Sequence, residues 1–147
     1  GETIFTPPRF KPDPSVYIKA AAAEGVAVTT CIAVEDSVSG VGSAANAEIA
    51  LIVGYVGASH ISAAAQDGHA ASLLLGAKSD NGVGADIVIL DMEDLPTIIN
   101  WFLELTMLDD AVEACKRGNF DFTAIQPQLR SKCWLKPAAA EPAPAAV

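Results

Sequence analysis

Apolar and polar residues follow one another along this chain in blocks that predict alternating helices and strands. Strong helix formers follow Pro14 at helical spacing, and Gly25 is placed to end this first helix. Three short apolar runs come later, and each is typical of a strand that is buried on both faces of a parallel sheet. These runs are residues 31–36, 49–57 and 85–92.

Further helices are predicted between and after these strands. Ser37 is a suitable N-cap for a helix of small residues over 38–47, and an alanine- and leucine-rich helix is predicted over 59–77. Residues 79–85 are typical of a turn, and residues 93–105 carry an apolar stripe at helical spacing. This order, with right-handed crossovers, predicts an α/β fold: a three-layer, Rossmann-like sandwich with parallel strands. Ligands of such folds bind at the carboxyl ends of the strands.

Composition divides the chain into four parts. Residues 1–12 hold three prolines and are expected to form an extended N-terminal segment, and residues 13–105 form the predicted α/β core. Residues 106–135 are predicted to add a helix at about 108–117 and an extension without a clear period. Residues 136–147 are an Ala/Pro-rich tail, expected to be disordered because it buries too little apolar surface.

Charge and composition limit the partners and the location that the sequence predicts. No uncharged apolar run approaches the roughly 20 residues of a spanning helix, so no membrane partner is expected. A net charge of −9 also argues against nucleic acid and anionic membranes, because both require a cationic surface. The first residues lack the features of a secretion signal, so a cytoplasmic location is expected. Cys31, Cys115 and Cys133 are predicted to be reduced thiols.

Two adjacent acids, Glu35 and Asp36, end the first predicted strand. Mutual repulsion and partial burial both disfavour the double anion, so the pair is most easily explained by a shared cation. Carboxylate oxygens are the ligands that Mg²⁺ prefers. A pair of acids alone is also typical of a solvated strand end. The neighbouring sequence therefore has to decide between the two interpretations.

That context resembles a known family. KPDPSVYIKAAAAEGV, then CIAVEDSVSGVGSAANA, then the strand IALIVGYVG, is similar to the C-terminal half of haloacid dehalogenase-like (HAD) phosphatases of the β-phosphoglucomutase-like branch. The resemblance covers roughly residues 10–103, and it implies a HAD-type sheet that is incomplete relative to the family. It implies that Lys11 neutralises the phosphoryl group, that Asp36 binds Mg²⁺, and that Glu35 is a second ligand, direct or through water. Ser37 and Gly40 would shape the turn at this phosphate edge.

The nucleophile of that family is missing from the sequence. The family places it in a strand that ends in DxDx(T/V), and no such motif occurs in these 147 residues. The nearest imitation, Asp91 to Asp94 after a strand, has Glu93 where the family has its second aspartate, and it already matches the family's last strand. We therefore expect a Mg²⁺-dependent phosphatase acting on a small phosphorylated metabolite in the complete protein, with this chain alone inactive. The alternatives are a noncatalytic remnant that serves for binding or structure, and an unrelated α/β binding domain.

The absent half also holds the central strand of the family's sheet. An unpaired sheet edge favours association with another chain, so a homodimer through this edge is a hypothesis. His60 and His69 lie nine residues apart, which matches no pair of ligands on one helix face. We expect structural roles for both, with His60 the nearer to the active-site edge.

Overall fold

The computed structural model of the chain describes residues 12–107 and 120–136. These residues form one four-stranded sheet, in which three parallel strands are followed by one antiparallel strand. In order across the sheet the strands are β1 (Ile32–Glu35), β2 (Leu51–Tyr55), β3 (Ile87–Ile89) and β4 (Cys133–Leu135). The register pairs Val34 with Val53, and Val53 with Ile87. The three predicted strands are confirmed, and each is shorter than its apolar run.

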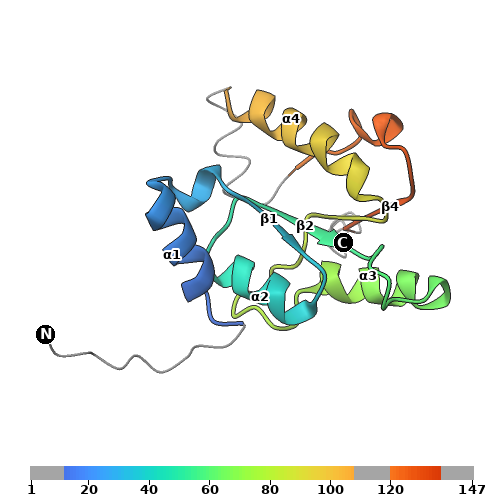
Figure 1. The fold of residues 1–147 in the computed structure, drawn as a ribbon, viewed down its shortest axis with the longest axis horizontal. Helices are drawn as coiled ribbons and strands as arrows, with labels where there is room; N and C mark the ends of the chain where they lie inside the picture. The colour runs from blue at the N-terminus through green and yellow to red at the C-terminus, as the bar shows by residue number, and fades with distance from the viewer. Residues whose placement is uncertain (1–11, 108–119, 137–147) are drawn as a thin grey trace, which may run out of the picture.

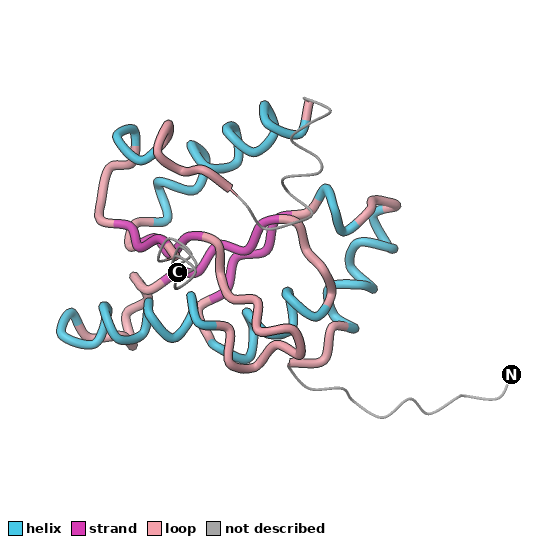
Figure 2. The backbone as a smooth tube through the Cα atoms, turned by 180° about the vertical axis from the view of Figure 1, so that it is seen from behind, coloured by secondary structure: helices cyan, strands magenta, loops and turns pink. Residues whose placement is uncertain are grey.

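Helices cover both faces of this sheet and complete three layers. Figure 1 shows α2 and α3 on one side and α4 on the other, and Figure 2 shows the strands from behind, between the helical layers. The helices are α1 (Ser15–Glu24), α2 (Val38–Asn46), α3 (Gln66–Leu75) and α4 (Leu95–Thr106). Short 3₁₀ turns are η1 (Val28–Thr30), η2 (Ala63–Ala65), η3 (Met92–Asp94) and η4 (Gln126–Gln128). The predicted three-layer α/β fold is confirmed.

Alternation along the central strand divides the core between the two faces. Ile52 of β2 points into a cluster with α2 and α3, while its neighbours Leu51 and Val53 point into a cluster with α4. The first cluster is rich in alanine, which lets α2 pack closely on the sheet. The second cluster is aromatic, because Phe102 of α4 and Phe122 are both buried in it. Both faces of β2 are therefore buried, as its continuous apolar run predicted.

The predicted helix ends are confirmed in part. Gly25 adopts a left-handed conformation, with φ of 66°, and its N–H bonds back to the end of α1. The helix predicted over 59–77 is shorter, because Ser62 is extended and η2 precedes α3. The helix predicted at 108–117, residues 1–11 and residues 137–147 lie outside the described residues.

The antiparallel strand β4 was not predicted, since its segment showed no clear period. It has only three residues. The residues beside it are held by polar contacts with residues that are distant in the sequence. Lys136 Nζ lies 3.3 Å from Oδ1 of the buried Asp86, which precedes β3. The other oxygen of Asp86 accepts a hydrogen bond from the Ile52 N–H at 2.8 Å. Burial raises the pKa of Asp86, while Lys136 and the Ile52 N–H favour its charged form.

Candidate functional site

Four of the five residues that the sequence singles out lie where β1 ends, in the turn that follows it and in the first part of α2. Because β1, β2 and β3 are parallel, their carboxyl ends share one edge of the sheet, and this turn begins there. Ser37 is the N-cap of α2: its hydroxyl oxygen accepts a hydrogen bond from the Gly40 N–H at 3.0 Å. The predicted capping role of Ser37 is thereby confirmed. The turn is fixed at its helical end.

Glu35, the last residue of β1, is directed toward α1. The Tyr17 hydroxyl donates a hydrogen bond to Oε1 of Glu35. The other carboxylate oxygen lies over Gly40, where a Cβ would come within 2.1 Å of it. Gly40 therefore allows the Glu35 carboxylate to approach the backbone closely, while its predicted part in the phosphate edge stays a prediction. The predicted role of Glu35 as a second metal ligand stays a prediction.

The surroundings of Tyr17, including its contact with Glu35, change the pKa of its phenol. Burial raises the pKa of the Tyr17 phenol well above its ordinary value, and the Glu35 hydrogen bond and negative charge raise it further. A raised folded-state pKa gives stability that is complete below the unfolded pKa of about 10 and is lost at higher pH.

We predict that Tyr17→Phe removes this pH dependence. At pH 8 the variant should be less stable than the wild type by about 1–2 kcal/mol, because a hydrogen bond to a charged group contributes roughly 1.5–3 kcal/mol and less where the pair is partly exposed. From pH 10 upward the difference should shrink, because the wild type alone has the Tyr17 proton to lose. Urea unfolding at pH 8, 10 and 11 measures it, with Tyr55→Phe as the control. An equal gap at every pH would refute the prediction.

Asp36 follows Glu35, and its main chain is held from α3. Nε2 of His69 lies 2.5 Å from the carbonyl oxygen of Asp36. A carbonyl oxygen only accepts, so the His69 tautomer in this contact carries its hydrogen on Nε2. Sequence reasoning missed this role: the two residues are 33 positions apart, and only the packing of α3 against α2 brings them together.

The Asp36 carboxylate is partly buried, and no side chain or N–H in the described part of the chain bonds to it. Both residues beside it are engaged, Glu35 by Tyr17 and Ser37 by Gly40. Within residues 12–107 and 120–136, no three His, Cys, Asp or Glu side chains gather as a metal cage. Mg²⁺ requires no such cage, because it keeps several waters and often binds one or two carboxylates plus phosphate oxygens. The donor set at Asp36 fits that ion.

Lys11 lies outside the described residues, so its predicted role stays a prediction. Its neighbours along the chain are described. The Pro12 carbonyl accepts a hydrogen bond from Nδ2 of Asn46 at 3.0 Å, and the Asp13 carbonyl accepts one from the Ser43 hydroxyl at 2.5 Å. These contacts fix the start of α1 against α2.

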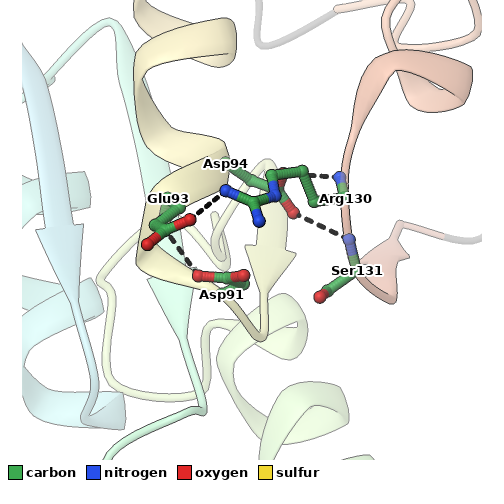
Figure 3. Close-up of polar contacts among 5 residues, drawn as sticks. All are labelled: Asp91, Glu93, Asp94, Arg130 and Ser131. Carbon is green, nitrogen blue, oxygen red and sulfur yellow. Dashed lines mark hydrogen bonds and ion pairs between the residues drawn. The ribbon is translucent and has the colours of Figure 1, made fainter.

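The acids after β3 have structural partners (Figure 3). The Asp91 carboxylate accepts a hydrogen bond from the Glu93 N–H at 2.9 Å and caps η3. The Glu93 carboxylate pairs with the Arg130 guanidinium. The Asp94 carboxylate is buried and accepts from the backbone N–H groups of Arg130 at 2.6 Å and Ser131 at 3.2 Å. This segment therefore anchors the chain before β4, which explains its acids without a catalytic role.

His60 is exposed after β2, and within the described residues it is His69 that bonds to Asp36. The histidine that reaches the turn is His69, the one the sequence placed farther from it. Cys31 and Cys133 are free thiols, as predicted, and Cys115 lies outside the described residues. No helix in the described ranges has the length and apolar content to cross a bilayer.

Comparison with known proteins finds similarity to haloacid dehalogenase-like proteins. A scan of protein-family profiles found no match to the chain. A haloacid dehalogenase-like hydrolase domain-containing protein of Arabidopsis thaliana is 49% identical over 45 residues, which are 31% of this chain and 14% of that protein. A crystal structure of a conserved haloacid dehalogenase-like protein of unknown function from Agrobacterium tumefaciens aligns with a TM-score of 0.52 and 33% identity. The alignment covers 63% of this chain and 36% of that one, so the chain spans only a minor part of either relative.

Proposed function

Because this chain belongs to the haloacid dehalogenase-like hydrolase superfamily, we propose that the complete protein is a Mg²⁺-dependent phosphatase of the β-phosphoglucomutase-like branch. Its substrate class is a small phosphorylated metabolite. The chain supplies the edge that holds the metal and the phosphate. A nucleophilic aspartate has to come from a DxDx(T/V) strand, which the 147 residues do not contain.

Each residue at this edge has a proposed task. Asp36 is the direct ligand of Mg²⁺, and Glu35 adds negative charge beside it, directly or through a water molecule. The Lys11 ammonium is a point charge that neutralises the phosphoryl oxygens. Ser37 and Gly40 fix the turn. When bound, the ion supplies charge stabilisation for the transferring phosphoryl group.

One observation carries the proposal: the Asp36 carboxylate lacks a partner among the described residues, while three hydrogen bonds hold the residues around it. Tyr17 holds Glu35, His69 holds the Asp36 carbonyl, and the Ser37 hydroxyl caps α2. A partly buried carboxylate on a fixed turn is prepared for a cation, because little conformational entropy is lost when it binds.

Hydrolysis of p-nitrophenyl phosphate tests the proposal. The assay compares the 147-residue chain with any longer protein encoded in frame upstream that adds a DxDx(T/V) strand. We expect hydrolysis to require that strand and Mg²⁺, to stop with EDTA, and to fall to background in Lys11→Ala and Asp36→Asn. Glu93→Gln is the control, because Glu93 is an acid near the same edge that pairs with Arg130.

The same assay separates the alternative function. If the longer protein carries the aspartate motif and shows no Mg²⁺-dependent hydrolysis, the noncatalytic remnant is the better description. Metal-dependent hydrolysis that Asp36→Asn leaves intact would contradict the assigned ligand alone.

We also propose a homodimer through the edge of β1. Among the described residues β1 pairs only with β2, so no described strand pairs with its other side, and an open strand edge favours pairing with another chain. Val16 and Ile18 of α1 are apolar and half exposed, at 55% and 49%, and Figure 1 shows α1 at the same end of the sheet as β1. Sedimentation at the mass of a single 15.2 kDa chain would contradict the dimer. A cytoplasmic location stays a prediction from the sequence.

A further inference from the structure

His69 is a polar side chain that the assigned roles do not use. It belongs to α3, and its ring reaches across to the turn after β1, where Nε2 donates to the Asp36 carbonyl at 2.5 Å. The ring is partly buried between the two elements. A contact of this kind fixes the peptide plane of the residue whose carboxylate has no partner in the described chain.

The helix that carries His69 is itself fixed. Its inner face buries Ala70 and Leu73 completely against the sheet. At its first turn Oδ1 of Asp67 accepts hydrogen bonds from Nζ of Lys132 at 2.8 Å and from Nε1 of Trp134 at 2.9 Å. Contacts with the sheet, with β4 and with the residue before β4 therefore hold α3, the helix that carries the His69 imidazole, in place.

We propose that His69 is a positioning residue for the metal ligand Asp36. Fixing the Asp36 carbonyl sets the backbone dihedral angle ψ of that residue, and with it the direction in which the carboxylate leaves the turn. Groups that orient a metal ligand without touching the ion affect affinity strongly, typically 10- to 100-fold. This inference rests on the proposed function, because it takes Asp36 to be the ligand.

Mn²⁺ binding to the complete 147-residue chain tests the inference without requiring turnover. Water-proton relaxation measures the affinity for Mn²⁺, which stands in for Mg²⁺. We expect His69→Leu to weaken binding about tenfold. His69→Gln should restore most of it, because the Gln side-chain amide can donate from nearly the position of Nε2. Ser72→Ala is the control on the same helix, since the Ser72 hydroxyl bonds within α3, to the Gly68 carbonyl.

The outcomes separate the two proposals. If Asp36→Asn abolishes Mn²⁺ binding and His69→Leu binds like the wild type, the proposed function stands and the role of His69 is wrong. If the His69–Asp36 contact only stabilises the fold, His69→Leu will have a lower melting temperature, but its folded chain will bind Mn²⁺ with unchanged affinity. That result would also refute the positioning role. If the wild type binds no Mn²⁺, or Asp36→Asn binds as well, both proposals fail.

A measurement on the wild type tests the inference even if the His69 variants do not fold. Long-range ¹H–¹⁵N correlation spectra of the imidazole show which ring nitrogen of His69 carries the hydrogen. We expect the hydrogen on Nε2, as donation to the Asp36 carbonyl requires. A hydrogen on Nδ1 alone would overturn the inference, whatever the result of the Mn²⁺ binding measurement.

Discussion

The Asp94→Ala variant is expected to lose about 3 kcal/mol of its free energy of unfolding. Asp94 is only 1% exposed, and its two oxygens accept from the N–H groups of Arg130 and Ser131. Removing the buried carboxylate breaks two hydrogen bonds to a charged group, at about 1.5–3 kcal/mol each. The chain before β4 should then detach from the end of β3.

Urea unfolding followed by tryptophan fluorescence measures this effect, because Trp134 lies in β4 and reports on the strand. Glu93→Ala is the matched control. Its ion pair with Arg130 is exposed, with both side chains 66% accessible, so its loss should cost less than about 1 kcal/mol. Equal losses in the two variants would contradict the anchoring role of Asp94.

Phe102→Ala is expected to cost about 3–5 kcal/mol, the usual range for a large aromatic side chain removed from a core. Phe102 is 1% exposed at the centre of the cluster between α4 and the sheet, and its ring lies 6.2 Å from that of Phe120. The loss should therefore loosen both α4 and the segment that follows residue 119.

Leu103→Ala is the control for this second variant, because Leu103 is the next residue of α4 and is 52% exposed. We expect it to change the free energy of unfolding by less than about 0.5 kcal/mol. Chemical denaturation compares the two. If Phe102→Ala were as mild as Leu103→Ala, the α4 face would not be the packed layer that the fold requires.

Local patterns were sufficient to predict the parallel part of the fold. Periodicity located α1, α2 and the three parallel strands, because each depends on residues that are close in sequence. Gly25 and Ser37 were predicted correctly for the same reason, since each acts on its own helix end. The α3 boundary was set too early, because an alanine-rich run fits η2 as well as a helix.

Interactions between distant residues account for what the sequence did not reveal. Strand β4 has no period of its own, and Asp94 holds its flank from 36 and 37 positions away. His69 acts on Asp36 from 33 positions away, whereas the position of His60 just after a strand had placed that histidine nearer to the active-site edge. Glu35 looked like a companion of Asp36, yet its carboxylate meets Tyr17, 18 positions earlier. Contacts like these depend on the packing of whole elements.

Mg²⁺ titration of the ¹⁵N-labelled chain, followed by amide chemical shifts, tests the central claim most directly. That claim is that the turn after β1 binds the metal through Asp36. We predict saturable shifts that are largest at residues 36–40 and that disappear in Asp36→Asn. Shifts centred on residues 91–94, or a turn that does not respond to Mg²⁺, would contradict it.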